Sequence, residues 1–451
     1  MIMKKSFAVL MGAMLLASGS LFAKVSVTKY AIRIDEPLTV ALIDAALADY
    51  QKTGGTGYSL ELSKCNDDGL AMAVQKFTAA KRITIRKSPD LTSIEPLKSV
   101  KADYIDLKEL PKVADVSPVG AVKGLQGLLI ENVGFKNPDL TFLAGLASLR
   151  SFELGYSPAT FKSLNGIDKC PRIGNLVIRH NGGNIDLSCL ANFKQLRKVD
   201  LRYVSKLDLT PLAQMPALTD LNLYGSTDLD FAPLAGCKKL RYIMIYATKR
   251  IKDYNDLGKI QSLENVNAGL SQMTDLSWAP LLPNLKKLSL FAEKYVSYAP
   301  LAGCKKLEDL TFWSMKGVVD IAQFADGGIP LKRLSFSGSA IANEAKLAAL
   351  GKSGTLIQLK LDEIARGKQE IDLAFLASLP TLKELNLDKS AVKNFAALAG
   401  CKQINRLSIR GTRGADLDVV AKLPELNTVS AGKEQQAALK EKLAGKKVRI
   451  Y

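Results

Sequence analysis

The chain has little of the chemistry on which most enzymes depend. Its 451 residues include one histidine, His180, and six cysteines. The motifs G-x-x-x-x-G-K-[ST], G-x-S-x-G and H-E-x-x-H do not occur in it. A catalytic histidine needs a nucleophile or a carboxylate within reach, and the pattern around His180 supplies neither. We therefore predict no enzyme, no catalytic residue, no metal and no cofactor; the alternative is an enzyme with an unrecognised site in the N-terminal segment.

Long apolar runs are also missing, except at the start. Lys4 and Lys5 precede an apolar stretch from Ser6 to Phe22, which the small residue Ala23 follows. This order is typical of a secretory signal peptide, whereas the alternative, a membrane anchor, needs ~20 apolar residues. We expect an exported protein of the periplasm, the outer cell envelope or the medium, with no membrane span in the mature chain.

Acidic residues are fewer than basic ones, and the formal charge is +18. Loss of residues 1–23 would remove two lysines and no acid, so 60 basic against 44 acidic residues would leave +16. Such an excess attracts anionic partners, which makes a binder of anionic polysaccharide or another polyanion one alternative. The basic residues are spread thinly along the chain, as is common for solubility, and we expect no nucleic-acid partner.

What the chain does have is an internal repeat. The pattern L-x-x-L-x-L opens at Leu218 and again at Leu240. Eleven further units open at Leu149, Ile173, Leu196, Leu263, Leu285, Leu307, Leu331, Leu356, Leu382, Ile404 and Leu426. Neighbouring openings lie 22 to 26 residues apart, and weaker units begin near Ala80, Ala102 and Leu125. A period of this length indicates stacked units that share one continuous core.

Each unit has two parts. The L-x-L portion alternates apolar and polar residues, which predicts a half-buried strand with its x residues facing outward. The second portion, as in Leu209–Ala213, contains a turn signal and a short apolar patch. A unit of this length has no room for a long helix, so we expect a 3-10 turn or a single helical turn there.

The repeat resembles the bacterial leucine-rich repeats of the internalin type. The sequence D-L-T-P-L-A that begins at Asp208 is very close to that family's turn motif, and Phe231–Ala235 and Tyr298–Ala302 are close to it. The resemblance covers about residues 80–430. It implies an α/β leucine-rich-repeat solenoid that is curved, with a parallel sheet on the concave face and short 3-10 or helical turns on the convex face.

One position departs from the family pattern. The ninth residue of such a repeat is usually an asparagine, whose side chain bonds the next turn, and Asn181 fits this rule. Hydroxyl residues hold the position elsewhere, namely Ser226, Thr248, Ser271, Ser390 and Thr412. Three units have Val204, Glu293 and Met315 there. We expect the asparagine ladder to be largely replaced by hydroxyls, or lost.

The two ends of the chain do not fit the repeat and are interpreted as caps over the open ends of the core. The predicted domains are a signal peptide at 1–23, an N-terminal cap at 24–79, the solenoid at 80–430, and a C-terminal cap helix and strand at 431–451. Amphipathic helices are expected at Pro37–Tyr50, Asp68–Ala80 and Lys433–Leu443.

The cysteines follow the repeat. Cys170, Cys237, Cys304 and Cys401 each stand three residues before the first position of a unit, where other units have Met, Ile or Leu. Free cysteine packs as a small buried hydrophobe, and we interpret these four in that way. Cys170 and Cys189 lie in neighbouring units, so a disulfide between them stays open.

Acidic residues also recur, just before the turns. They are Asp186, Asp208, Asp230, Asp320, Asp372 and Asp418. Single acids one unit apart offer too few oxygen ligands for calcium, so we expect each to cap the short helical turn that follows it.

The outward strand positions carry the functional content of the sequence. The last x of L-x-x-L-x-L-x reads, down the stack, Arg179, Arg202, Tyr224, Tyr246, Gly269, Phe291 and Trp313. Tyr242 and Met244 join this face from the neighbouring columns. Exposed aromatic groups commonly mark interaction sites, although the same column would also serve as a ladder that only stabilises the sheet.

Polar residues continue the same face. They are Asp309, Thr311, Arg333, Ser335, Gln358, Lys360, Asp362, Glu384, Asn386, Asp388, Arg406, Ser408 and Arg410. A polar rim around an aromatic centre is the usual anatomy of a protein interface, and Arg179 and Arg202 have the planar geometry to meet carboxylates. We predict an exported scaffold that binds a protein, of its own envelope or of a host surface. Binding of an anionic glycan through an edge formed by Lys238-Lys239, Lys286-Lys287 and Lys305-Lys306 is the alternative.

Overall fold

The computed structural model describes residues 25–136, 140–156, 163–179, 184–270 and 273–451. The predicted export signal, His180 and the slots of Asn181 and Ser271 lie outside these ranges. The chain divides into two compact units, residues 1–196 and 197–451, which are treated separately below. Within the described ranges, no helix has both the length and the apolar character to cross a membrane.

Unit 1 is a stack of parallel strands that begins with an antiparallel pair. Its strands are β1 (Val25–Thr28), β2 (Ala31–Ile34), β3 (Tyr58–Ser63), β4 (Ala80–Arg86), β5 (Tyr104–Leu110), β6 (Gly127–Val133), β7 (Ser151–Gly155) and β8 (Asn175–Arg179). Strands β1 and β2 are antiparallel, and each strand from β2 to β8 pairs in parallel with the next. Parallel pairing therefore starts upstream of the L-x-x-L-x-L units.

Helices and short turns connect these strands. They are α2 (Val40–Gln51), α3 (Asp67–Lys76), and the 3-10 turns η1 (Glu95–Ser99), η2 (Ser117–Ala121), η3 (Thr141–Gly145), η4 (Ile167–Lys169) and η5 (Ser188–Asn192). The two expected helices of the N-terminal segment are present, because Thr39 and Asn66 accept hydrogen bonds from backbone N–H groups in their first turns.

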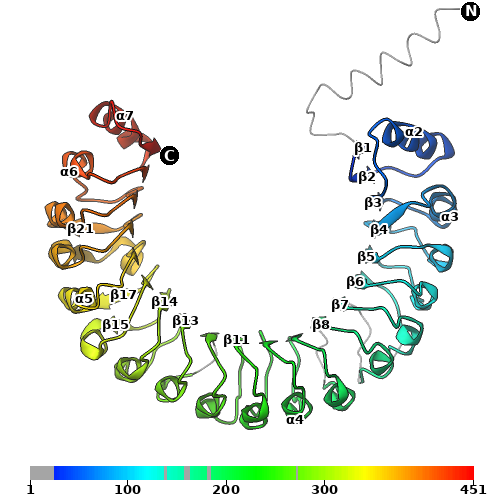
Figure 1. Cartoon of the computed structure of the whole chain (residues 1–451), viewed down its shortest axis with the longest axis horizontal. Helices are drawn as coiled ribbons and strands as arrows, with labels where there is room; N and C mark the ends of the chain where they lie inside the picture. The colour runs from blue at the N-terminus through cyan, green and yellow to red at the C-terminus, as the bar shows by residue number, and fades with distance from the viewer. Residues whose placement is uncertain (1–24, 137–139, 157–162, 180–183, 271–272) are drawn as a thin grey trace, which may run out of the picture. The chain divides into compact units, whose positions relative to one another are not determined.

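Unit 2 repeats one strand and one turn throughout. Its main strands are β9 (Lys198–Arg202), β10 (Asp220–Asn222), β11 (Tyr242–Tyr246), β12 (Asn265–Gly269), β13 (Lys287–Phe291), β14 (Asp309–Trp313), β16 (Arg333–Ser335), β18 (Gln358–Lys360), β20 (Glu384–Asn386), β22 (Arg406–Ser408), β23 (Thr428–Ser430) and β24 (Arg449–Ile450). Each pairs in parallel with the next in this order. Figure 1 shows these strands on the inner side of the unit's curve.

The outer side of unit 2 holds its turns and short helices (Figure 1). They are α4 (Thr210–Ala213), η6 (Ala232–Gly236), η7 (Tyr254–Lys259), η8 (Ala279–Leu281), η9 (Ala299–Gly303), η10 (Ile321–Gln323), η11 (Ala325–Gly327), η12 (Glu344–Lys346), α5 (Leu347–Gly351), η13 (Ile364–Gly367), η14 (Leu373–Ser378), η15 (Phe395–Gly400), α6 (Leu417–Lys422) and α7 (Lys433–Lys442). Two small parallel pairs join β15 (Val318–Asp320) with β17 (Ala340–Ala342), and β19 (Glu370–Asp372) with β21 (Ala391–Lys393). The predicted architecture of parallel strands and short turns is confirmed.

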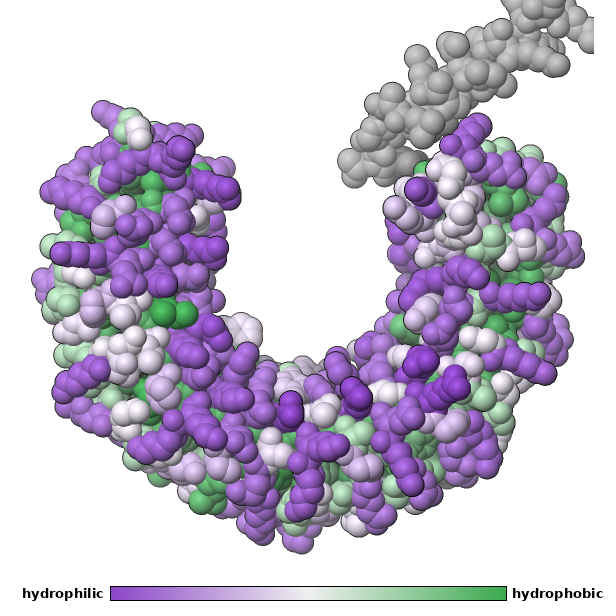
Figure 2. Space-filling model, viewed as in Figure 1, coloured by the Kyte–Doolittle hydropathy of each residue, from purple (hydrophilic) through white to green (hydrophobic). Residues whose placement is uncertain are grey.

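The alternating burial of each strand explains the stack. In β11, Ile243 and Ile245 are fully buried, whereas Tyr242, Met244 and Tyr246 are partly exposed. The inward residues of one strand pack on those of its neighbours, because in-register parallel pairing keeps equivalent positions ~4.8 Å apart. In the view of Figure 2, hydrophobic residues of unit 2 show as small areas between hydrophilic ones.

A left-handed residue follows strands such as β11, β13 and β14 and extends the ladder of hydrogen bonds. Ala247, Ala292 and Ser314 have φ of 58°, 50° and 48°. Their N–H groups donate to the carbonyl of the residue one turn further on, as Ala292 does to Trp313 at 3.0 Å. The backbone therefore turns sharply after the last outward strand position while its polar groups remain satisfied.

Buried hydroxyls replace the asparagine ladder, as expected from the sequence. The Ser390 hydroxyl donates to the carbonyl of Leu361 at 2.6 Å and accepts from the N–H of Ile364 at 3.2 Å. Ser226 and Thr412 likewise donate to a carbonyl one turn back. The same group of buried hydroxyls includes Thr248, which bonds a carbonyl in its own turn, and Ser339, which accepts from Met315.

Replacing Ser390 with alanine should lower the free energy of unfolding by about 1–3 kcal/mol, because the buried N–H of Ile364 loses its acceptor. Urea unfolding followed by circular dichroism measures this. The matched control is Ser26→Ala, at an exposed position of β1, which should shift the unfolding midpoint very little. Equal midpoints for the two variants would show that the hydroxyl does not stabilise the turn.

The repeat cysteines are buried, as predicted. The thiols of Cys170, Cys237 and Cys401 donate to carbonyls one turn back, at 3.3, 3.4 and 3.1 Å. Cys170 and the half-buried Cys189 are both free thiols. Burial raises the pKa of Cys237 to about 11 and that of Cys401 to about 12, so these sulfurs stay protonated near neutral pH.

Protonated, buried thiols react slowly with disulfide reagents. We expect the native protein at pH 8 to react with less than about one equivalent of Ellman's reagent over a period in which the unfolded protein titrates all six thiols. Absorbance at the reagent's wavelength measures both. Only four thiols after unfolding without reductant would instead reveal one disulfide.

The recurring acids cap the turns, with one exception. Asp186, Asp208, Asp230 and Asp372 each accept from the N–H two residues later, at 2.8 to 2.9 Å, and so does Asp320 at 3.0 Å. The prediction for Asp418 is wrong. Asp416 caps α6 instead, and Asp418 forms an ion pair with Lys442 of α7.

Candidate functional site

The outward column of unit 2 forms a continuous row of rings, here called the aromatic ladder. It consists of Tyr203, Tyr224, Tyr246, Phe291 and Trp313. Their ring centroids are 5.3 Å apart from Tyr203 to Tyr224 and from Tyr224 to Tyr246. The next two steps, to Phe291 and to Trp313, are 5.5 and 5.4 Å. These spacings are those of favourable stacked and edge-to-face contacts.

Gly269 makes the ladder continuous although it has no ring. It stands between Tyr246 and Phe291 in the register of β11, β12 and β13. The two rings nevertheless meet, edge to face. A Cβ atom on Gly269 would lie 2.4 Å from both the Cβ and the carbonyl oxygen of Phe291. The absence of a side chain therefore provides the room in which Phe291 crosses toward Tyr246.

The rings of the ladder lie on the strands of unit 2 and are partly exposed to solvent. Trp313 is 51% exposed, and Tyr224, Tyr246 and Phe291 are half-buried. Each ring contacts its neighbours along the stack, so the ladder contributes to the sheet and also presents apolar surface. Tyr203 extends it by one ring. The column pattern missed this tyrosine because the residue follows Arg202, and its left-handed φ of 59° turns it to the same face.

The neighbouring columns add to this face. Tyr242 and Met244 are half-buried on β11. Burial raises the pKa of Tyr242, against the opposing effect of its hydrogen bond with Asn267. Met244 is one strand from Asn222 and from Asn267 in register. Both side chains thus border the ladder on β11, as the sequence pattern predicts.

The two arginines of the predicted site are engaged within the chain. Arg202 binds Asp200 through Nε at 2.9 Å and Nη2 at 2.6 Å, and Asn222 donates to the same carboxylate. Arg179 belongs to unit 1, where it contacts Glu153 at 3.2 Å. The carboxylate contact that the sequence predicts with a partner is therefore already made by the protein's own acids.

The face of unit 1 has a different character. Its outward positions alternate in charge, with Glu61 between Arg33 and Arg86, and Arg82 paired to Asp106 at 2.7 Å. Because these exposed and half-exposed pairs neutralise each other, they contribute little to attraction of a charged partner. Exposed rings occur in both units, as Tyr104 and Tyr156 show in unit 1. The row of contacting rings from Tyr203 to Trp313 lies in unit 2, which makes its face the stronger candidate.

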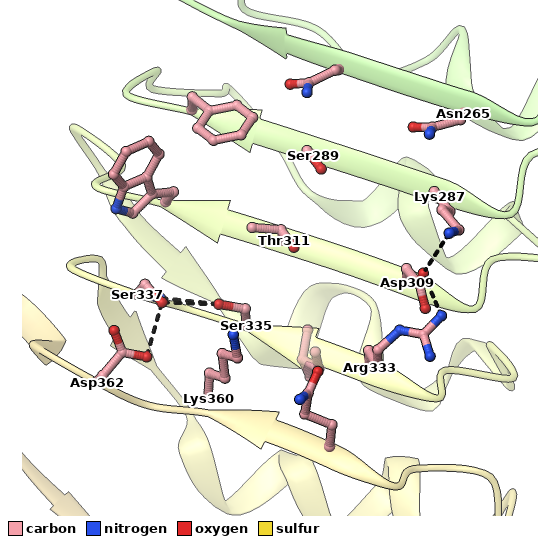
Figure 3. A pocket seen from close by; sticks show the side chains of 15 residues that line it. Asn265, Lys287, Ser289, Asp309, Thr311, Arg333, Ser335, Ser337, Lys360 and Asp362 are labelled. Carbon is pink, nitrogen blue, oxygen red and sulfur yellow. Dashed lines mark hydrogen bonds and ion pairs between the residues drawn. The ribbon is translucent and has the colours of Figure 1, made fainter. Parts of the chain in front are cut away.

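A polar hollow of about 510 Å³ adjoins the ladder on β12 to β18. Phe291 and Trp313 are among the residues that line it, and short side chains such as Ser289 and Thr311 form its floor (Figure 3). The two-residue period of the strands predicts that these residues lie on one face. It does not predict that long charged side chains and aromatic rings leave a depression between them.

Most lysines of the three predicted pairs form hydrogen bonds or ion pairs within the chain. Lys305 donates to the carbonyls of Ala302 and Gly327, both at 2.8 Å, and Lys238 donates to that of Ala235 at 3.1 Å. Lys286, Lys287 and Lys306 contact Glu264, Asp309 and Asn284. Their role in satisfying turn carbonyls and acids weakens the case for a basic edge. Among the residues with assigned structure, no group of three or more His, Cys, Asp and Glu is placed to hold a metal ion.

Solved structures with a similar arrangement exist. A leucine-rich-repeat protein of Leptospira interrogans is 13% identical, over 93% of this chain and 100% of the other, with a TM-score of 0.50. The fold is a leucine-rich-repeat solenoid. An internalin of Listeria monocytogenes is 19% identical over 80% of this chain and 93% of its own, with a TM-score of 0.43.

A second Listeria structure, a functional domain described as including a cysteine ladder, is 16% identical over 80% of this chain and 74% of its own, with a TM-score of 0.40. No family model and no curated protein matches the sequence of the solenoid. The structural likeness therefore establishes the leucine-rich-repeat fold alone, and function has to be argued from the face itself.

Replacing Gly269 with alanine should separate Phe291 from Tyr246 and destabilise the protein by about 1–3 kcal/mol, as overpacking does elsewhere. Thermal unfolding measures the stability, and near-ultraviolet circular dichroism reports the ring contacts. Gly124→Ala is the matched control, because a Cβ atom there would meet nothing within 4 Å. If both variants matched the parent protein, the ladder would not depend on the gap at Gly269.

Proposed function

We propose that this chain is an exported, non-enzymatic scaffold that binds a protein partner through the aromatic ladder of unit 2. The observation that carries the proposal is a row of five rings at 5.3 to 5.5 Å that ends in the half-exposed Trp313. A soluble protein rarely leaves aligned aromatic surface uncovered without a use for it. The export part of the proposal rests on Lys4, Lys5 and the apolar run that follows them.

The surroundings of the ladder favour a protein as the partner. Tyr, Trp and Arg dominate the energetic centres of protein interfaces, and a polar rim excludes water from them. Beyond Trp313, the face continues with polar residues such as Ser335 and Asp362. A flat row of rings beside hydrogen-bonding groups fits a protein surface better than it fits a small apolar ligand, which needs an enclosed pocket.

The polyanion alternative is disfavoured by the contacts of the lysine pairs. Lys238 and Lys305 hold the carbonyl ends of the 3-10 turns η6 and η9. The two binding modes differ in their response to salt, because binding through exposed lysines weakens steeply as ionic strength rises. Binding centred on the rings should change little between low and high salt.

The test is a crosslinking pull-down with the full chain against envelope extract and against host-surface extract. A variant with alanine at Tyr224, Tyr246, Phe291 and Trp313 should lose a protein that the parent chain captures, because it lacks most of the apolar contact area. The captured protein is identified by mass spectrometry, purified and titrated against both chains.

The matched control carries alanine at Tyr30 and Tyr451, exposed aromatic residues that are not part of the ladder, and should retain the partner. Circular dichroism verifies that all variants are folded. If the ladder variant still captures the same protein with the same affinity, the rings serve only to stabilise the sheet and the proposal fails.

A further inference from the structure

The hollow beside the ladder is a trough that crosses several strands. Its floor consists of the short side chains Ser289, Thr311 and Ser335, one from each of β13, β14 and β16 (Figure 3). These hydroxyls recur at the strand spacing of ~4.8 Å. Trp313 also lines the trough, and Lys360 reaches from β18 toward Ser335 (Figure 3).

The charges that line the trough are unequally satisfied. Asp309 accepts from Arg333 at 2.7 Å and lies 3.5 Å from Lys287. Asp362 accepts from the hydroxyl of Ser337 at 2.9 Å. Lys360 makes no ion pair with any residue that the structure describes. Three cations and two acids line the hollow, which leaves a net charge of +1. Lys360 is the cation among these three for which the described residues provide no ion pair.

We propose that the trough binds an extended peptide segment of the protein partner, with an apolar side chain on Trp313 and a carboxylate on Lys360. The inference rests on the function proposed above and names the chemistry that the partner must supply. Hydroxyl groups both donate and accept, so the floor can meet the alternating N–H and C=O groups of an extended backbone. Rings combined with serine, threonine and asparagine are also the combination that protein-recognition surfaces use.

The positions of Trp313 and Lys360 set the spacing in the peptide. They are separated by two strand steps of ~4.8 Å and one two-residue step of ~6.6 Å along a strand, which places them about 12 Å apart. In an extended chain with ~3.3 Å per residue, side chains four positions apart lie on the same face and ~13 Å apart. The segment should therefore carry its apolar residue and its acid at positions i and i+4.

The experiment uses the full chain and three synthetic octapeptides with blocked ends. The first, GSFSGSEG, has phenylalanine and glutamate four positions apart. In GSFSGSQG a glutamine replaces the glutamate and removes its charge. GSFEGSSG has the same amino-acid composition as the first peptide, but its phenylalanine and glutamate are adjacent. Binding is followed by protection of tryptophan fluorescence from acrylamide. The chain has two tryptophans, and Trp278 is fully buried, so quenching reports Trp313.

The peptide GSFSGSEG should protect Trp313 at lower concentrations than either comparison peptide. Lys360→Gln should weaken its binding about fivefold, the effect of losing one partly exposed charge-assisted hydrogen bond. The same substitution should leave the binding of GSFSGSQG unchanged. Lys352→Gln, at an exposed lysine beside α5, is the matched control and should bind all three peptides as the parent chain does.

Three results would overturn the inference: equal protection by all three peptides, an unchanged affinity of Lys360→Gln for GSFSGSEG, or protection by an oligomer of N-acetylglucosamine without protection by any peptide. The last would identify the trough as a glycan site. None of these results depends on the pull-down. Suppose that the ladder variant loses the partner in the pull-down and that one of these three results is also obtained. The proposed scaffold function would then be supported, and only the proposal of a peptide-binding trough would fail.

Discussion

A single turn of this chain cannot bury its own apolar side, and every other feature follows from that constraint. Ile243 and Ile245 of β11 are fully buried only because neighbouring turns supply the surfaces on which they pack. Stability in such a stack is a sum of interfaces between neighbours. Groups that bridge one turn to the next, such as the hydroxyl of Ser390 and the thiol of Cys401, are therefore as much a part of the core as the leucines.

The same constraint separates structural from functional positions. Inward residues are fixed in size by their neighbours, whereas outward residues need only satisfy their own polar groups. In unit 1 they do so by pairing charges, as Arg82 does with Asp106. In unit 2 some of them pair charges too, as Arg333 does with Asp309, and others form the aromatic ladder. The difference between the two faces is thus a difference in chemistry on equivalent positions of one repeated backbone.

Much of this organisation is readable from the sequence. The two-residue period fixes which side chains face outward, so Tyr224, Tyr246, Phe291 and Trp313 could be assigned to one column. The slots of Ser390 and Cys237 follow from their place in the repeat. By contrast, strands β2 and β3 lack the leucine pattern, and the parallel pairing of β2 with β3 and of β3 with β4 shows only in the backbone.

The remaining differences between the sequence-based predictions and the structure have local causes. Two acids, Asp416 and Asp418, stand in the same turn, and the backbone geometry alone decides that the first is the cap. Tyr203 joins the ladder through a left-handed φ that its sequence position does not reveal. The trough depends on the relative lengths of side chains from five strands, which a pattern of apolar and polar letters does not encode.

The left-handed residues that follow the ladder strands β9, β11 and β13 have a consequence for how the face can change over time. Their N–H groups donate to the carbonyl of the column position in the next turn, as Ala292 does to that of Trp313, and these bonds involve no ladder side chain. The backbone geometry of the column therefore does not depend on the ladder side chains, although the position of Gly269 has no room for a side chain. Substitutions at Tyr224 or Trp313 leave this backbone bond in place, so the exposed side chains of this face can change one residue at a time on an unchanged scaffold.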